Sequence, residues 1–421
     1  MKLLVAYSAR TTFVGTTWEY LDAFRRHRDT EVQYVHVTHD SIPKVEWGSY
    51  DAVIVSYCAR LSMPGYVSRR FLDDLSRFRG VRALVLQDEY ENTNELLRQA
   101  ERIDPDLIFS CILSPQRERV YPPERFARAE LHTVHTGFVP DDHKGIETRV
   151  DPRKVAERPV GIGYRGRRLS PAYGRLGRLK AEVGEVMRSE ARRRHVSHDI
   201  SIEESDRIYG DAWIRFIASC RCMLGSESGS NVFDWDGAIQ RRCLTETDPE
   251  SLRRIAAEIE REENDLGMGQ ISPRIFECAM MRTPMALVEG GYSGILEAGT
   301  HYISIAEDFT NLDEVFEALV DLPAMQAMAD RTHADLVESG VHSSFAHIGS
   351  ILRTIRATIE RAASIRTEPE TPPIPRLPHP ALRFALTERA TSEPRKRVRS
   401  LIRRYIVAIL KRLSRITGGG I

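Results

Sequence analysis

The chain has 421 residues, of which 42% are hydrophobic and 29% charged, so it can bury a sizeable core and does not have the composition of a disordered protein. At about 150 residues per domain, this length predicts two or three domains. Basic and acidic residues balance at 60 each, but residues 395–421 hold nine basic groups and no acidic one. The other 394 residues therefore carry 51 basic and 60 acidic groups, a net charge of −9, which argues against nucleic-acid binding by the body of the chain.

The cysteines and the N-terminus indicate the compartment. The six cysteines form no CxxC pair, which argues against a zinc cluster or a disulfide framework and favours reduced thiols. The apolar run in MKLLVAYSAR is too short for a secretory signal, and the longest apolar run, 405–410, is too short to span a bilayer. We therefore expect a cytoplasmic protein.

Residues 1–150 alternate short apolar runs with amphipathic segments. The runs at 3–8, 31–37, 51–58, 83–90 and 107–113 predict strands, and the segments at 16–27, 69–80 and 94–103 predict helices. Continuous apolar strands separated by helices are typical of a parallel sheet buried on both faces. This region is therefore predicted to be one Rossmann-like domain.

A polar segment at 139–159 is interpreted as a linker, and a second α/β pattern follows it. Strands are expected at 159–166, 196–202, 222–228, 285–290 and 301–306, and helices at 177–194, 211–220, 251–264, 272–283, 312–322, 326–338 and 343–364. The predicted fold class is α/β, with two tandem Rossmann-like parallel-sheet domains at 1–150 and 151–366. Ligands of such sheets bind at the carboxyl ends of the strands, and here also in the cleft between the domains.

The last 55 residues read differently. Residues 367–394 contain seven prolines and predict a semi-rigid linker. In 395–421, one helical face is apolar and the other is basic; the apolar residues are Val398, Leu401, Ile402, Tyr405, Ile409, Leu413 and Ile416. A basic amphipathic helix on a tether predicts an anchor to an anionic membrane surface, with a partner helix and a nucleic-acid contact as alternatives.

The motif GIGYRG at 161–166 matches G-x-G-x-x-G, but the next helix begins too late for a dinucleotide fingerprint. Its arginines offer another interpretation. Arg165 and Arg168, together with Lys180, lie just beyond a predicted strand end, where guanidinium groups suit a diphosphate. A solvated basic loop is the alternative.

The motif GSESGS at 225–230 follows another predicted strand. It differs from G-x-S-x-G, so a nucleophile elbow is disfavoured. Glu227, Ser228 and Gly229 form either a ligand-binding loop or a plain β-turn.

The stretch 271–296 is the most informative part of the sequence for a ligand-binding site. Ser272 is a natural N-cap and Pro273 a natural first helical residue, so a helix is expected to begin there and to offer a phosphate site, with Arg274 beside it. Glu277, one turn on, is suited to accept hydrogen bonds from the vicinal diol of a ribose; a buried helix acid is the alternative. A second loop at the same sheet edge contains Glu289, Tyr292, Ser293 and Gly294.

The first domain should supply an acid–base group. Asp88 ends a predicted strand and is the first candidate for a general base or for positioning an acceptor hydroxyl, with a helix N-cap as the alternative. His132 and His135 stand three residues apart without a third ligand nearby, so we predict no metal site and favour packed histidines, with an acceptor-side role for His135 as the alternative. The loop 9–17 is rich in threonine and suits acceptor contacts.

At 276–284, FECAMMRTP is similar to the pattern (L/F)-E-A-x-A-x-G-T-P, and 265–325 resembles the C-terminal half of group 1 glycosyltransferases of the GT-B fold. The resemblance is to the bacterial branch with a spore-coat-maturation-like C-terminal domain. It implies that Glu277 binds the nucleotide ribose and that the loop before its helix meets the donor phosphates. The acidic residue that the family carries eight positions earlier falls on Gly269 here.

The resemblance implies a donor site in the second domain, an acceptor site in the first, and no metal, because basic side chains and a helix N-terminus neutralise the leaving diphosphate. We therefore expect a glycosyltransferase that uses a nucleotide-diphosphate sugar, without a cofactor, on an unknown cell-envelope or polysaccharide acceptor. The loop 289–294 would meet the sugar. The alternatives are a degenerate sugar-nucleotide-binding or scaffold protein at the membrane, which Gly269 favours, and a GT-B epimerase or phosphorylase.

Overall fold

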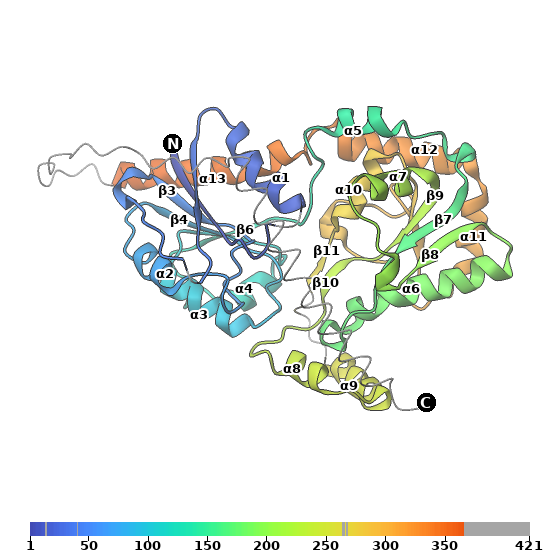
Figure 1. Ribbon diagram of the computed structural model, residues 1–421, viewed down its shortest axis with the longest axis horizontal. Helices are drawn as coiled ribbons and strands as arrows, with labels where there is room; N and C mark the ends of the chain where they lie inside the picture. The colour runs from blue at the N-terminus through green and yellow to red at the C-terminus, as the bar shows by residue number, and fades with distance from the viewer. Residues whose placement is uncertain (13–14, 40, 263–265, 267, 366–421) are drawn as a thin grey trace, which may run out of the picture.

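The computed structural model describes residues 1–12, 15–39, 41–262, 266 and 268–365. The expected linker at 367–394 and the expected membrane helix at 395–421 lie outside these residues. The described chain forms two domains, each a parallel sheet flanked by helices (Figure 1). The prediction of two tandem Rossmann-like parallel-sheet domains is confirmed.

The first sheet has six parallel strands in the order β2-β1-β3-β4-β5-β6. They are β1 (Lys2–Tyr7), β2 (Glu31–His36), β3 (Ala52–Val55), β4 (Val81–Val85), β5 (Leu107–Ser110) and β6 (Glu130–Thr133). The central strands β3, β4 and β5 are buried along their whole length, and all their residues except Arg82 and Ser110 are apolar. The edge strand β6 has no fully buried residue, so hydrophobicity alone gave no signal for it.

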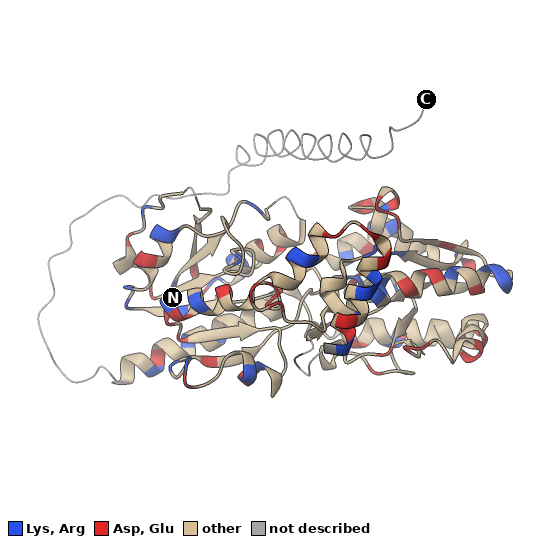
Figure 2. Cartoon of the chain, turned by 90° about the horizontal axis from the view of Figure 1, so that it is seen from below, with Lys and Arg blue, Asp and Glu red and all other residues tan. Residues whose placement is uncertain are grey.

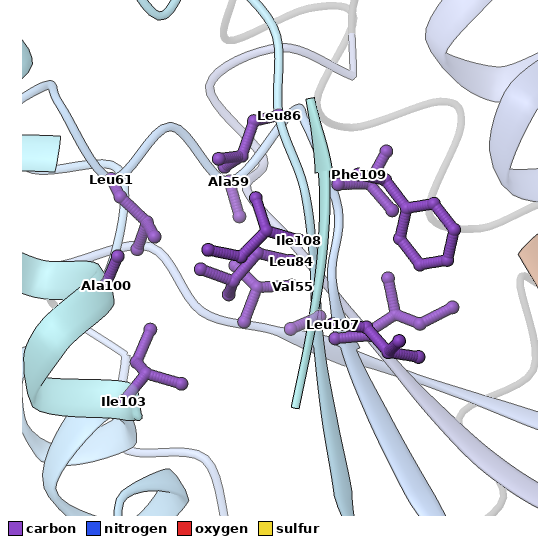
Figure 3. Packing of buried hydrophobic residues seen from close by; sticks show 14 of the residues in the cluster. Val55, Ala59, Leu61, Leu84, Leu86, Ala100, Ile103, Leu107, Ile108 and Phe109 are labelled. Atoms are coloured by element: carbon purple, nitrogen blue, oxygen red, sulfur yellow. The ribbon is translucent and has the colours of Figure 1, made fainter. Parts of the chain in front are cut away.

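Helices cover this sheet on both sides: α1 (Gly15–Ala23), α2 (Arg69–Leu75), α3 (Thr93–Ile103) and α4 (Gln116–Val120). In α3, Ala100 and Ile103 share the buried face, and Figure 3 shows them directed towards Leu84 and Ile108 of the neighbouring strands. Each buried aliphatic side chain of this size contributes roughly 1.5–3 kcal/mol. The packing fixes the loops that follow the strands at the carboxyl edge of the sheet.

The second sheet has five parallel strands in the order β13-β12-β9-β7-β8. They are β7 (Val160–Arg165), β8 (His198–Ser201), β9 (Cys220–Gly225), β12 (Met285–Val288) and β13 (Ile303–Ile305). Its helices are α6 (Gly174–Arg193), α7 (Asp211–Ser219), α10 (Pro273–Met280), α11 (Leu312–Val320) and α12 (Leu322–His333), followed by a π-helical turn at Ala334–Glu338.

The interpretation of 139–159 as a linker needs correction. The segment holds α5 (His143–Val150) and a 3-10 turn (Val155–Glu157), and it ends on Arg158, which is 1% exposed. The Arg158 guanidinium donates to the carbonyls of Cys220 at 3.0 Å and Met281 at 2.9 Å and to the Thr283 hydroxyl at 2.7 Å. No residue of α5 is buried, so the sequence has no apolar face there that would predict a helix. Arg158 can be buried because backbone carbonyls accept hydrogen bonds from its guanidinium.

An insertion between β9 and α10 connects the two domains. It contains β10 (Ser228–Ser230) and β11 (Met268–Gln270), which pair antiparallel, and the helices α8 (Ala238–Thr245) and α9 (Pro249–Glu262). Figure 1 shows β10 and β11 between the two sheets. Phe233 and Met268 pack into the core of the first sheet, and the Asp234 amide donates to the Tyr90 carbonyl at 2.9 Å. The insertion therefore ties the loop after β4 to the second domain.

The final helix, α13 (Ser344–Ile365), follows the second sheet in the sequence but packs against the first domain. Its buried residues Ile348, Ile351, Leu352 and Ile355 belong to the first hydrophobic core. The chain crosses between domains twice at one place, where Val139 and residues 342–344 exchange backbone hydrogen bonds of 2.8 Å. Figure 1 shows α13 lying along the first domain.

Charged residues of both signs are spread over the helices and connecting segments of the two domains (Figure 2). All six cysteines are unpaired and buried. Within the described ranges, no helix combines the length and the apolar character needed to cross a membrane.

Candidate functional site

A pocket of about 320 Å³ opens at the carboxyl edge of the second sheet. The adjacent strands β7 and β9 end there, and α6, α7 and α10 pass beside it. Every lining residue belongs to the second domain: Tyr164, Arg165, Gly166, Arg167, Lys180, Arg207, Ile208, Tyr209, Trp213, Ser226, Ser228, Ser272, Pro273, Arg274 and Glu277. Six of the predicted ligand-binding residues, namely Arg165, Lys180, Ser228, Ser272, Arg274 and Glu277, thus come together in one hollow.

Five basic side chains line this pocket. Arg165 and Arg207 pair with carboxylates, which leaves three cations: Lys180, Arg167 and Arg274. Burial, followed by the charges of Arg274 and Arg167, lowers the pKa of Lys180 to about 8, while Asp88 of the first domain opposes the shift. The Lys180 Nζ contacts the Ser228 hydroxyl at 3.3 Å. Among the described residues, none of the three cations has a carboxylate partner. Like charges held together in a part-buried hollow repel one another, so an anionic ligand would stabilise this arrangement.

Arg274 is held in place by aromatic rings. Its guanidinium carbon lies 5.0 Å from the ring centre of Tyr164 and 5.4 Å from that of Trp213. It also donates to the backbone carbonyls of Leu224 and Arg165 at the ends of β9 and β7. Cation–π contacts and carbonyls fix the guanidinium without neutralising its charge.

Glu277 lies one turn further along α10. Its Oε2 accepts a hydrogen bond of 2.7 Å from the Trp213 indole, and burial raises the pKa of its carboxyl group. Its Oε1 has no hydrogen-bond partner in the described part of the chain. Glu277 is therefore an oriented acceptor with one oxygen available to hydroxyl groups in the pocket.

The start of α10 has the predicted form. Ser272 occupies the N-cap position and Pro273 the first helical position, and the Ser272 side chain makes no capping hydrogen bond. Gly137, in the crossover between the domains, lies against the helix start: its φ is +81°, and a Cβ there would approach the Pro273 Cα to 2.9 Å. Glycine is required for this close approach. The N-terminal end of α10 thus borders both the pocket and the crossover between the domains.

The two arginines expected at a diphosphate behave differently. Arg165 lines the pocket, but its guanidinium pairs with Asp199 at 2.9 Å and stacks over Phe216 at 4.4 Å. Arg168 lies outside the lining and pairs with Glu185. Arg167, which was not among the predicted residues, lines the pocket instead of Arg168. The sequence could not distinguish the two, because residue type does not tell which way a side chain points after a strand end.

Within the GSESGS loop, Ser228 faces the pocket and Glu227 turns away from it. The Glu227 Oε1 accepts from the Tyr292 amide at 2.6 Å, and burial raises the pKa of the Glu227 carboxyl. Its carboxyl carbon lies 2.8 Å from the place of a Cβ on Gly269. Gly229 pairs with Gly269 and has a φ of +103°. The glycine at 269 therefore has a steric reason: Glu227 fills the space.

The loop 289–294 braces the site without lining this pocket. Tyr292 is fully buried and its hydroxyl donates to the Val288 carbonyl. The Ser293 hydroxyl accepts from the Ile271 amide at 3.1 Å, next to the start of α10. Glu289 lines a separate acidic hollow, and Gly294 has a φ of +72°. The Ser293 hydroxyl also donates to the Gln270 side chain at 3.2 Å, so protein groups occupy the polar atoms of Tyr292 and Ser293.

In the first domain, Asp88 follows β4 with a φ of +53°, a conformation that non-glycine residues adopt at a cost of about 1–3 kcal/mol. Its Oδ1 accepts from the Tyr90 hydroxyl at 2.9 Å, and its Oδ2 lies 3.7 Å from Arg60. The alternative of a helix N-cap is excluded, because Asn92 holds the N-cap position of α3.

The two histidines of the HTVH segment are packed. His132 stacks on Phe109 with ring centres 5.3 Å apart. His135 lies 6.0 Å from Phe276 and beside His342 and His347, and burial, followed by these histidines, lowers its pKa to about 3. In the part of the chain that the structure describes, no group of three His, Cys, Asp or Glu side chains is placed to hold a metal ion.

Sequence reasoning missed one side of the pocket. Arg207, Ile208, Tyr209 and Trp213 line it, and none of them was predicted. Their position could have been predicted from the sequence. Residues after 202 follow a predicted strand and therefore lie at the same carboxyl edge as Arg165 and Ser228.

No family model and no curated protein matches the chain. Among solved structures, it is similar to Anabaena HepE in complex with UDP and glucose, with 13% identity over 85% of this chain and 100% of the other and a TM-score of 0.46. It is also similar to an α,α-trehalose 6-phosphate synthase from Burkholderia multivorans (10% identity, 88% and 99% covered, TM-score 0.45). A UDP-N-acetylglucosamine 2-epimerase matches with 12% identity, 87% and 98% coverage and a TM-score of 0.37. The likeness at these identities is one of chain arrangement.

Proposed function

We propose that this protein is a GT-B glycosyltransferase that moves a sugar from a nucleotide-diphosphate sugar to an acceptor held on the first domain. One observation carries the proposal: three cations without carboxylate partners and the oriented carboxylate of Glu277 share one pocket at the carboxyl edge of the second sheet. The cations match a diphosphate, and a carboxylate oxygen matches the hydroxyls of a ribose.

The transfer needs charge stabilisation more than covalent help. The acceptor oxygen bonds to the anomeric carbon of the sugar, the bond from that carbon to the diphosphate breaks, and its electron pair leaves with the nucleoside diphosphate. Lys180, Arg167 and Arg274 would stabilise the negative charge that develops on the leaving oxygen. In this proposal these three side chains neutralise the leaving group, a role that a divalent cation has in other transferases.

The acceptor would approach from the first domain. Asp88 is the candidate that receives the acceptor proton or positions its hydroxyl, because it lies in the loop after β4 and its charge acts on Lys180 of the second domain. Residues 395–421 would, on their sequence, bring the enzyme to an anionic membrane surface.

The test measures release of nucleoside diphosphate from uridine, adenosine, guanosine and thymidine diphosphate sugars. We expect hydrolysis or transfer with at least one donor, and a loss of at least about tenfold in kcat/KM for Glu277→Gln and Lys180→Met, since each removes a charged hydrogen-bond partner. Glu185→Gln is the matched control, because Glu185 pairs with Arg168 outside the pocket.

The alternatives have distinct outcomes. Tight nucleotide binding without turnover of any donor would indicate a scaffold protein, and interconversion of sugar nucleotides would indicate an epimerase. Donor turnover that is unchanged in Glu277→Gln would contradict the assigned site.

A further inference from the structure

The pocket has two chemically different ends, and the strand order sets them apart. In the order β9-β7-β8, the loop after β9 contributes Ser226 and Ser228, and the loop after β8 contributes Arg207 and Tyr209. Neighbouring strands are about 4.8 Å apart, so the two loops leave the sheet about 10 Å from each other. Lys180 contacts Ser228 and so marks the cationic end.

Glu277 lines the same pocket and accepts a hydrogen bond from Trp213. Two protein groups contact the Trp213 ring: the Arg274 guanidinium lies 5.4 Å from its centre, and Phe216 stacks with it at 5.8 Å and 28°. Trp213 therefore positions Glu277 and Arg274.

Tyr209 differs from Trp213. It lines the pocket yet is 66% exposed, one of the few large side chains of the described chain left open to solvent. Arg207 lies over its ring at 5.1 Å and pairs with Glu204. Stacking on one side by a guanidinium leaves the other side of the ring open to a planar group.

We infer that Tyr209 is the stacking platform for the nucleobase of the donor, an assignment that rests on the proposed function. A nucleoside diphosphate carries its base and its phosphates on opposite sides of the ribose. With the phosphates at Lys180 and the ribose at Glu277, the base lies at the Arg207–Tyr209 end. Stacking on an aromatic ring is tolerant of base identity, because every base has a π-face.

The experiment compares the dissociation constants of UDP, ADP, GDP and inorganic pyrophosphate for the wild type, Tyr209→Ala and Tyr209→Phe, measured by calorimetry. Tyr209→Ala should weaken the nucleotides by about tenfold, the size of one lost stacking contact. Pyrophosphate should bind equally to all three proteins, and Tyr209→Phe should match the wild type, because the ring is retained.

Nucleotide affinities that are unchanged in Tyr209→Ala overturn the base platform and leave the proposed function standing. An equal loss for pyrophosphate also overturns it, because the side chain would then act on the phosphate end or on folding. Failure of the wild type to bind any of the three nucleotides, together with no turnover of the thymidine diphosphate sugar, overturns the proposed function together with this inference.

Discussion

At the scale of single residues, Lys180 shows how the fold prepares a group for a ligand. It is placed on α6 beside Ser228, where burial and two arginines depress its pKa to about 8. A lysine with this pKa keeps its proton at neutral pH and yields it within the range of ordinary measurements. Its charge is therefore available to a diphosphate, and it can be titrated.

This gives a pH dependence with a definite sign. A bound diphosphate favours the charged lysine and raises the pKa of Lys180, so binding takes up a proton above pH 8. The affinity for a nucleoside diphosphate should fall as the pH rises from 7 to 9, by up to about tenfold per pH unit above the pKa of the free protein. Calorimetry at pH 7, 8 and 9 measures this fall.

Lys180→Met is the matched comparison. It should bind the nucleotide more weakly at pH 7 and show a flat profile up to pH 9. A Lys180→Met variant that retains the slope of the wild type would assign the titration to another group.

At the scale of elements, β10 and β11 place a glycine where the family pattern has an acid. Gly269 lies opposite Gly229, and the Glu227 carboxylate occupies the space in front of it while accepting from the Tyr292 amide. The two strands, the Glu227 side chain and the loop 289–294 form one packed unit behind the pocket. A side chain at 269 and the observed position of Glu227 exclude each other.

Gly269→Ala should therefore lower the free energy of unfolding by about 1–3 kcal/mol, the usual cost of overpacking. Adding Glu227→Ala should relieve the clash, so that the double variant loses less than the sum of the two single losses. Gly48→Ala is the control, because a Cβ there meets nothing within 4 Å. Denaturant unfolding measures all four variants, and additive losses would refute the steric account.

At the scale of the whole molecule, the two domains share material. The last helix, α13, and the insertion residues Phe233 and Met268 complete the core of the first sheet, although all of them follow the first residues of the second domain in the sequence. The first domain is therefore incomplete without segments from beyond residue 230. Backbone hydrogen bonds between Val139 and residues 342–344, and between Asp234 and Tyr90, connect the two domains. These bonds keep the pocket of the second domain opposite the loop that contains Asp88.

Ile351→Ala tests this sharing. Ile351 is fully buried in the first core, so the substitution should cost about 2–5 kcal/mol of unfolding free energy. Glu360→Ala, on the exposed side of the same helix, should change stability by less than about 0.5 kcal/mol. Equal midpoints of thermal or denaturant unfolding for the two variants would show that α13 does not complete the core.

How far the sequence predicts the site depends on the kind of information each residue needs. Ser272, Pro273 and Glu277 were found because helix starts have local rules, and Lys180 and Arg165 because they follow a strand. The choice of Arg167 over Arg168 turns on side-chain direction. Ser228 faces the pocket and Glu227 points away from it because of contacts with β11 and with the loop 289–294.

The sequence by itself determined the two parallel sheets, because strands buried on both faces must be continuously apolar and the helices between them amphipathic. It also determined that loops after these strands meet at one edge. Only the tertiary structure decided that the segment at 139–159 folds around a buried Arg158, that α13 returns to the first domain, and that Trp213 and Tyr209 join the pocket. These features depend on partners far away in the chain, and long-range contacts leave no local periodicity to read.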